Sequence, residues 1–318
     1  MINGGFPRGT GDGEGVVQGV NAKTMRQNWE EGDHVLGRWN LMDQDGETIE
    51  ESSEMTLGVE GATALAGDFD GDGSDEVAIY SGGQWFIDLN GNGVWDAGDL
   101  WVQLGTQLDR PVVGDWDGDG KDDIAIFGRQ WERDPQRIRR DPGLPDPDNK
   151  RRREIDNRQL AVRGEDRGED RERLLRRGNT GDLRADAVDH VFGYGDQVDT
   201  PIAGDWNGDG IDQIAVYRSG VWLLDSDGDG RWVATNDDRA RYGGAGDEPI
   251  VGDFNGDGID EIGVIRGDTW IIDIDGDRKI TGNDLQINVP RESAESQPVV
   301  GDWDGDGKDE PGYYDEAA

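Results

Sequence analysis

A nine-residue acidic motif recurs five times in this chain of 318 residues and constrains its fold more than any other feature. Each copy reads Asp-Phe/Trp-Asp/Asn-Gly-Asp-Gly-x-Asp-Glu/Asp/Gln. Oxygen-bearing side chains at alternate positions, followed by a glycine that permits a sharp bend, are typical of loops that wrap a hard cation such as calcium. Turns that merely favour Asp and Gly are the alternative. The copies are 68–76, 115–123, 205–213, 253–261 and 302–310.

The spacing of the motifs predicts a repeat protein. Their first aspartates are separated by 47, 90, 48 and 49 residues. Such a period is typical of a propeller blade or a solenoid coil. Each motif follows a short apolar segment, such as 111–113, and precedes a hairpin pattern, such as 77–87. This gives about four strands per repeat, which is the content of a propeller blade.

The two ends of the chain carry complementary halves of a repeat. Residues 311–315 follow the last motif as the start of a hairpin, and residues 35–43 resemble a second half, with Trp39 in the place of Trp85. We therefore predict an all-β fold, a β-propeller of five four-stranded blades closed by the N- and C-terminal half-blades. Closure protects sheet edges that an open array exposes. An open solenoid is the alternative.

Each motif predicts one primary calcium site. Positions 1, 3 and 5 supply side-chain oxygens, position 7 supplies a backbone carbonyl, and a carboxylate closes the shell. We expect position 8 to close it, because position 8 is Asp in every copy whereas position 9 varies. The predicted ligands are Asp68, Asp70, Asp72, Ser74, Asp75, Asp115, Asp117, Asp119, Lys121, Asp122, Asp205, Asn207, Asp209, Ile211, Asp212, Asp253, Asn255, Asp257, Ile259, Asp260, Asp302, Asp304, Asp306, Lys308 and Asp309.

The motif, with the glycine before it and the apolar strand after it, resembles the FG-GAP calcium-binding repeat of integrin-type β-propellers. The resemblance covers roughly residues 60–318 without the insertion described below. It implies a loop that joins two strands of a blade and that calcium holds rigid. Two departures stand out. Propellers of this family usually have more blades, and their usual Asp at position 9 is present here only at Asp123, with Glu76, Gln213, Glu261 and Glu310 in the other copies.

A second set of acidic loops predicts up to three secondary calcium sites. The segment 88–99 resembles a twelve-residue EF-hand loop with Asp instead of Glu at its last position. Counterparts begin at Asp225 and Asp273, and polar hairpin ends are the alternative. The predicted ligands are Asp88, Asn90, Asn92, Asp96, Asp99, Asp225, Asp227, Asp229, Asp273, Asp275, Asp277 and Asp284.

The step of 90 residues contains an insertion. Trp131 matches Trp85 and Asp186 matches Asp96, so the intervals 134–186 and 88–96 correspond; they differ by 52 − 8 = 44 residues. The second repeat is therefore expected to lack its secondary loop. We predict three parts: a Gly-rich arm at 1–30, a propeller at 31–318, and an Arg-rich, partly helical insertion at 135–185 within blade two.

Composition excludes several function classes. The net charge is −39, which disfavours nucleic acid as a partner and which bound calcium would offset. There is no Cys and there are two His, so disulfides, thiol chemistry and a histidine-based active site are not expected. No apolar run is long enough to span a membrane. Such loops suit the millimolar calcium outside cells, so we expect an extracellular or cell-surface protein, exported after loss of a leader or by another route.

We expect a calcium-stabilised structural or adhesive protein, not an enzyme, that binds copies of itself through its arm and insertion in a surface or filamentous structure. A glycan-binding propeller lectin is the alternative, and it predicts open aromatic pockets around the ring. Inter-blade packing is the expected role of the repeated aromatics, such as Trp116 and Trp222. An enzyme acting on an extracellular polymer comes third, because no catalytic pair can be told apart from metal ligands.

Overall fold

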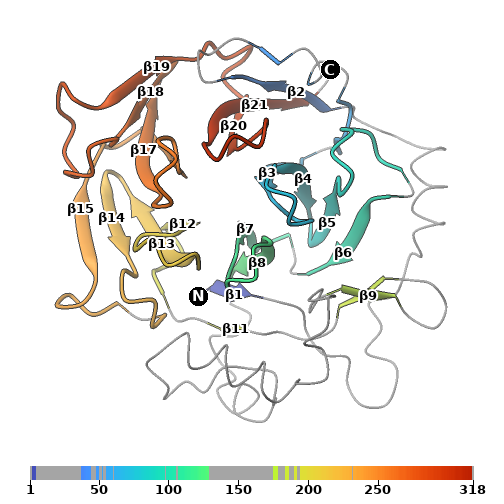
Figure 1. The fold of residues 1–318 in the computed structure, drawn as a ribbon, viewed down its shortest axis with the longest axis horizontal. Coiled ribbons are helices and arrows are strands. Elements are labelled where there is room, and N and C mark those ends of the chain that lie inside the picture. The colour runs from blue at the N-terminus through green and yellow to red at the C-terminus, as the bar shows by residue number, and fades with distance from the viewer. Residues whose placement is uncertain are drawn as a thin grey trace.

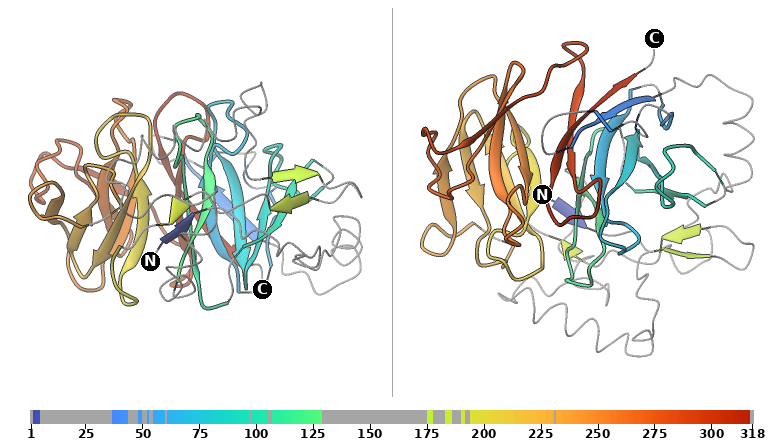
Figure 2. Two further views of the ribbon diagram at one scale, coloured as in Figure 1. Left: turned by 90° about the horizontal axis from the view of Figure 1, so that it is seen from below. Right: turned by 45° about the horizontal axis from the view of Figure 1, so that its top comes forward.

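The computed structural model describes residues 2–4, 37–43, 48–49, 52, 55–59, 61–96, 98–104, 107–128, 175–177, 183–185, 190–191, 194–230 and 232–316. All regular elements in these ranges are β-strands, and the ranges contain no α-helix. Small antiparallel sheets stand around a common centre, as blades do in a β-propeller (Figures 1 and 2). The prediction of an all-β, propeller-like fold is therefore confirmed.

Three of the sheets have four strands in sequence order, each strand pairing antiparallel with the next. This order follows from short Gly-containing turns, such as the one at Gly82 and Gly83, which leave room only for neighbours to pair. The strands are β3 (Thr63–Gly67), β4 (Glu76–Ser81), β5 (Gln84–Ile87) and β6 (Leu100–Gln103); β12 (Thr200–Gly204), β13 (Gln213–Arg218), β14 (Val221–Leu224) and β15 (Asp238–Arg241); and β16 (Glu248–Gly252), β17 (Glu261–Arg266), β18 (Thr269–Ile272) and β19 (Leu285–Asn288).

The sheet of the second repeat contains a strand from the N-terminal end of the chain. Its order is β11 (His190–Val191), β1 (Ile2–Gly4), β8 (Asp123–Phe127) and β7 (Arg110–Gly114). Ile2 lies opposite Phe127, as Trp85 of β5 lies opposite Tyr80 of β4. The first residues of the chain thus hold the place of a third strand. Residues 131–134, which match β5 in sequence, lie outside the described residues.

A three-stranded sheet joins the two ends of the repeat array. It consists of β2 (Gly37–Leu41), β21 (Glu310–Glu316) and β20 (Gln297–Gly301), with Trp39 opposite Tyr314. The predicted pairing of residues 35–43 with residues 311–315 is therefore present. Trp39 also occupies the predicted place, because its indole donates a hydrogen bond to the Leu57 carbonyl at 2.9 Å. Among the described residues this sheet has three strands, one fewer than a blade, so the number of five blades stays a prediction.

The core lies between the sheets. The second strand of a sheet is buried on both sides: Ile214 and Val216 of β13 pack with Trp116 of the preceding repeat, whereas Ala215 and Tyr217 pack with the following one. This explains why the segment after each motif is apolar throughout, although side chains of a strand alternate between its faces. Among the described residues, each of five core clusters spans two neighbouring sheets, including the last and the first.

The described parts of the insertion form a short hairpin of β9 (Leu175–Arg177) and β10 (Leu183–Ala185). β10 lies against β6 at the edge of the first sheet (Figure 1). The described residues of the insertion are strands, so its predicted helical part is not confirmed. The rest of the insertion, and the arm beyond β1, lie outside the described residues.

Candidate metal centres

The five motif loops, which we call the inner loops, each connect the first and second strands of a sheet. They join β3 to β4, β7 to β8, β12 to β13, β16 to β17 and β20 to β21. The glycines at positions 4 and 6 adopt left-handed backbone angles, as Gly71 (φ 80°) and Gly73 (φ 94°) illustrate. Since residues with a side chain rarely adopt such angles, these two positions are glycine in every copy.

The aspartate at position 1 organises each inner loop. Asp302 Oδ1 accepts hydrogen bonds from the amides of Gly305 at 2.8 Å and Asp306 at 3.1 Å, while its Oδ2 accepts one from Gly307 at 2.7 Å. Asp68, Asp115, Asp205 and Asp253 make the same contacts. The backbone of the loop therefore wraps around this carboxylate, and these hydrogen bonds do not require a bound ion.

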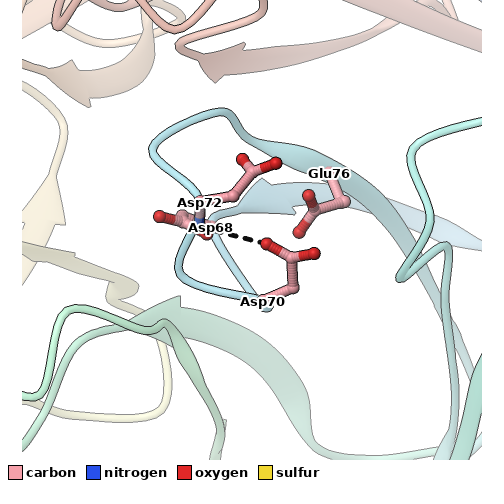
Figure 3. A group of neighbouring side chains, drawn as sticks. All are labelled: Asp68, Asp70, Asp72 and Glu76. Carbon is pink, nitrogen blue, oxygen red and sulfur yellow. Dashed lines mark hydrogen bonds between the residues drawn. The ribbon is translucent and has the colours of Figure 1, made fainter.

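Carboxylates converge inside the inner loops. Asp68, Asp70, Asp72 and Glu76 each offer one oxygen, and these oxygens lie within 4.8 Å of one another (Figure 3). Asp253, Asp257 and Glu261 form an equivalent group in the fourth repeat, and Asp115, Asp117 and Asp119 form one in the second. Clustered carboxylate oxygens fit a hard cation such as calcium, magnesium or manganese.

In the first and fourth inner loops, position 9 and not position 8 completes the group of carboxylates. Glu76 Oε2 accepts a hydrogen bond from the Phe69 amide at 3.0 Å, and Glu261 Oε2 accepts one from the Phe254 amide at 3.0 Å, so each glutamate folds back over its own loop. Position 9 is the first residue of the second strand. Because successive strand residues point to opposite sides, position 8 must face away from the loop that position 9 closes.

The position-8 aspartates bind the preceding inner loop instead. Asp122 Oδ2 accepts a hydrogen bond from the Asp68 amide at 3.0 Å, and the Asp122 amide donates one to the Asp68 carbonyl at 2.7 Å. We call this pair of bonds a clasp. The expectation that position 8 closes its own loop is not met. Equivalent clasps join Asp212 to Asp115, Asp260 to Asp205, Asp309 to Asp253, and Asp75 to Asp302.

The clasps explain the glycine that precedes each motif. A Cβ atom added at Gly301 would lie 2.6 Å from Asp75 Oδ2, and one added at Gly204 would lie 2.6 Å from Asp260 Oδ2. Any side chain here would therefore displace the clasp aspartate. The clasp between Asp75 and Asp302 connects the last motif to the first, so these bonds continue around the whole ring.

The clasp aspartates also repel one another. Burial raises the pKa of Asp122 well above its usual range, and the charges of Asp212 and Asp75 raise it further. Burial and the neighbouring Asp212 and Asp309 likewise raise the pKa of Asp260. The centre of the ring therefore concentrates buried carboxyl groups, and their raised pKa values favour the protonated form.

Without a bound cation, the position-9 glutamates hold protons near neutral pH. Burial, followed by repulsion from the aspartates of the same loop, raises the pKa of Glu76 and of Glu261 to about 8 and that of Glu310 to about 7. The folded state then binds more protons than the unfolded state between the ordinary pKa near 4.5 and these values. A cation in the loop would replace those protons.

This predicts an inverted pH dependence for the metal-free protein. Because the folded pKa values lie above the unfolded ones, the stabilising contribution is complete below about pH 4.5 and is lost as the pH rises through about 8. In chelator, the melting temperature should be lower at pH 8.5 than at pH 6. Calcium should reduce that difference, and a metal-free melting temperature that rises over this range would contradict the prediction.

The third inner loop differs from the others at position 9. Gln213 Oε1 accepts a hydrogen bond from the Trp206 amide at 2.9 Å, in the way that Glu76 accepts one from Phe69. This bond fixes the orientation of the amide, so its Nε2 donates to the carbonyl of Ile211. That carbonyl is the predicted position-7 ligand. In this loop an N–H group therefore occupies the place where a glutamate offers an oxygen.

We expect Gln213→Glu to strengthen cation binding at the third loop. The substitution replaces an N–H donor by a carboxylate oxygen and frees the Ile211 carbonyl. Calorimetric titration with calcium should show a gain at this loop of roughly tenfold or more in affinity, because hydrogen-bonded charged groups contribute about 1.5–3 kcal/mol. Glu261→Gln is the reciprocal control and should weaken the fourth loop. Equal affinities in the parent and both variants would refute the role of position 9.

The inner loop and the outer part of the same repeat face a common acidic hollow. One hollow of about 250 Å³ is lined by Asp70, Asp72, Glu76 and Asn90, with Trp303 at one side. Another of about 320 Å³ lies in the fourth repeat, where Asp257, Glu261 and Asp275 line it beside Trp206. The hollows recur at equivalent places, so the repeats present the same chemistry more than once.

The second set of acidic segments, which we call the outer loops, connects the third strand of a sheet to the fourth. Their first residues, Asp88, Asp225 and Asp273, accept a backbone hydrogen bond five residues on, as Asp225 Oδ2 does from Gly230 at 2.8 Å. Asp99 and Asp284 end the first and third of these loops, as predicted. Asp225 with Asp227 and Asp229, and Asp273 with Asp275 and Asp277, bring carboxylate oxygens within 4.8 Å.

Sequence analysis missed Asp237. This loop is one residue longer than its counterparts, so Asp237 falls outside a twelve-residue template that begins at Asp225. The structure places Asp237 where Asp99 and Asp284 stand: its Oδ2 accepts a hydrogen bond from the Val233 amide. The available signal was the acidic residue directly before the fourth strand, which all three loops share. Asparagine side chains donate to an aspartate in all three loops: Asn90 and Asn92 to Asp96 at 3.2 and 3.1 Å, Asn236 to Asp227 at 2.8 Å, and Asn283 to Asp275 at 3.0 Å.

The repeated aromatics pack between sheets. Trp85, Trp222 and Trp270 are fully buried, and Trp116 and Trp206 are at most 6% exposed. The indoles of Trp85 and Trp222 donate to the carbonyls of Leu104 and Tyr242. These side chains therefore serve the inter-sheet core, as expected.

Comparison with known proteins does not assign the chain to a family. No protein-family model matches it, and a search among curated proteins finds no match. Within the described residues, no helix has the length and apolar character needed to cross a membrane.

Proposed function

We propose that this chain is a calcium-stabilised structural or adhesive protein, located outside the cell or at its surface, that assembles by exchanging its N-terminal strand between copies. The observation that carries the proposal is β1, a strand from the start of the chain that lies between β8 and β11 of the second sheet. The FG-GAP resemblance of the motifs supports a calcium-bound repeat architecture. It does not by itself indicate assembly.

Calcium is the cation that fits best. The candidate ligands of the inner loops are oxygens throughout, which suits a hard cation and disfavours zinc or copper. The net charge of −39 gives the folded chain a large electrostatic benefit from divalent ions. We propose one calcium ion in each inner loop that carries an acid at position 9.

The proposed propeller has five blades. The three-stranded sheet of β2, β21 and β20 would be the fifth, since it carries the last motif and packs on both neighbouring sheets. A ring of this kind leaves no open end of the array, so repeat stacking cannot extend the assembly. Association must then use segments that lie outside the repeat pattern, which are the arm and the insertion.

Strand exchange supplies a plausible contact at low cost. β1 pairs with Ala125, Ile126 and Phe127 through backbone bonds, which need no apolar side chains of the arm. The same pairing can form when the strand comes from a second copy, because domain swapping reuses identical contacts. The Arg-rich insertion would add charge pairs to a neighbour's acidic surface, and salt should weaken them.

Light scattering tests the proposal directly. The parent should exceed the monomer mass at high protein concentration in calcium, and removal of residues 1–30 should reduce it to a monomer. Arg151→Ser, Arg152→Ser and Arg153→Ser together test the insertion. A parent that stays monomeric would refute assembly and would favour the glycan-binding alternative, for which the acidic hollows are the place to search.

Engineered cysteines can show which chain supplies β1. Asn3 lies opposite Val191, and the chain has no native Cys. After oxidation, Asn3→Cys/Val191→Cys should give covalent dimers or larger species on a non-reducing gel if the strand is exchanged. Monomers with an internal disulfide would contradict exchange. Each single cysteine variant is the control for random collisions.

A further inference from the structure

We propose that the outer loops 225–237 and 273–284 are a second class of divalent-cation site, each closed by the aspartate that precedes the fourth strand. These sites lie beyond the inner-loop function proposed above and do not depend on it. They have in common two buried aspartates, one at each end of the loop. The structure assigns Asp225 and Asp237 to one site, and Asp273 and Asp284 to the other.

Buried oxygens without a hydrogen-bond partner carry the inference. Asp225 and Asp273 are 1% and 2% exposed, and Asp237 and Asp284 are 7% and 8% exposed. In each of these four side chains, Oδ2 accepts a backbone amide while Oδ1 is buried without a partner. A buried carboxylate oxygen left in this way is costly unless a cation or a proton is bound to it.

The remaining carboxylate oxygens of each loop favour a bound cation over protonation as the partner of the buried oxygens. Asp227 and Asp229 bring oxygens within 4.8 Å of Asp225, and Asp275 and Asp277 do so around Asp273. One proton cannot satisfy four carboxylates, whereas calcium accepts six to eight oxygen ligands and tolerates irregular geometry. Magnesium, which requires near-octahedral geometry and retains several water ligands, fits such a ring of protein carboxylates less readily than calcium does.

Each site also touches the preceding repeat. The Tyr242 side chain is buried at the end of the third repeat and lies against Asp284 and Asp273 of the fourth. Tyr194 is buried in the core cluster between the second and third repeats, where the charges of Asp225 and Asp237 raise its pKa. A cation in an outer loop would therefore hold the third strand to the fourth and also fix the surface on which the preceding repeat packs.

Ion counting tests the inference with calcium alone as the probe. After equilibrium dialysis, Asp273→Asn/Asp284→Asn and Asp225→Asn/Asp237→Asn should each bind about one calcium ion fewer than the parent. Asp268→Asn, which removes one carboxylate charge from the exposed turn before β18, should bind the parent's number. An unchanged ion count in both double variants would overturn the proposal. Loss of ions from inner-loop variants alone would leave the inner-loop proposal intact and exclude this one.

Thermal unfolding separates a cation site from a purely structural one. Replacing unpartnered carboxylates by amides removes repulsion, so the metal-free double variants should melt at or above the temperature of the metal-free parent. The increase in melting temperature that calcium produces should be smaller than in the parent. If the variants melt lower than the parent by the same amount with and without calcium, the aspartates are structural and the proposal is wrong.

Discussion

Removal of residues 301–318 should abolish the cooperative unfolding of the whole repeat array rather than shorten it by one repeat. The deletion removes β21, the middle strand of the sheet that joins both ends. It also removes Tyr313 and Tyr314, which are buried in the two clusters on either side of that sheet. Full burial of a large side chain contributes roughly 1.5–3 kcal/mol, so these losses, with those of the two clasps formed by Asp302 and Asp309, approach the 5–15 kcal/mol typical of a whole domain.

The measurement is denaturant unfolding followed by tryptophan fluorescence. The truncated chain should show a broad transition with a reduced slope, since an opened array exposes less surface in one step. An open solenoid would tolerate the deletion, because its repeats contact only their neighbours. A sharp transition with an unchanged slope would therefore show that the ends do not support each other.

Asp75→Ala is a milder version of the same experiment. It removes the side-chain bond of the clasp between the last motif and the first. Asp260→Ala removes the equivalent bond inside the array and is the matched control. In a closed ring the two variants should lose similar stability. In an open array Asp75→Ala should be close to neutral, while Asp260→Ala should still destabilise.

Removal of calcium should lower the melting temperature by about 10 °C or more. Each ion that binds only the folded state contributes about 2.7 kcal/mol when its concentration is a hundred times the dissociation constant. In a chain of this size, about 1 kcal/mol corresponds to roughly 2–4 °C. Loss of calcium from several inner loops should therefore lower the melting temperature more than almost any single substitution does.

The chelator experiment needs a control for ionic strength. Magnesium at the same concentration should restore less of the melting temperature than calcium does. Asp117→Ala/Asp119→Ala should bind about one ion fewer in calorimetric titration, because it removes two of the three carboxylates of the second inner loop. A melting temperature that is equal with and without chelator would refute the structural role of calcium.

The sequence predicted the strands because its signals are local. A period near 48, short turns and apolar tetrapeptides indicate hairpins, and Trp39 shows that residues 35–43 are a displaced half-repeat. The role of position 8 could not be found in this way. Whether Asp122 faces its own loop or the preceding one depends on how neighbouring sheets pack, which no single repeat encodes. The glycine before each motif was a visible but ambiguous sign of that packing.

Two other features were beyond local reasoning. β1 consists of three residues in a polar segment, and no pattern in these residues indicates that they pair with β8. Asp237 was missed because a template of fixed length does not allow for one extra residue. Both errors arise where the chain departs from its repeat, and these departures are also where the proposed assembly contact and one of the outer sites lie.

The clasps have a consequence for how such a chain can evolve. Every repeat carries both partners of a clasp. The glycine before the motif and the position-1 aspartate contact the next repeat, and the position-8 aspartate binds the preceding one. A gene segment that encodes one repeat therefore encodes both of the surfaces through which repeats bind one another. Tandem duplication or loss of such a segment would preserve every interface without compensating substitutions, and blade number could change in a single genetic event.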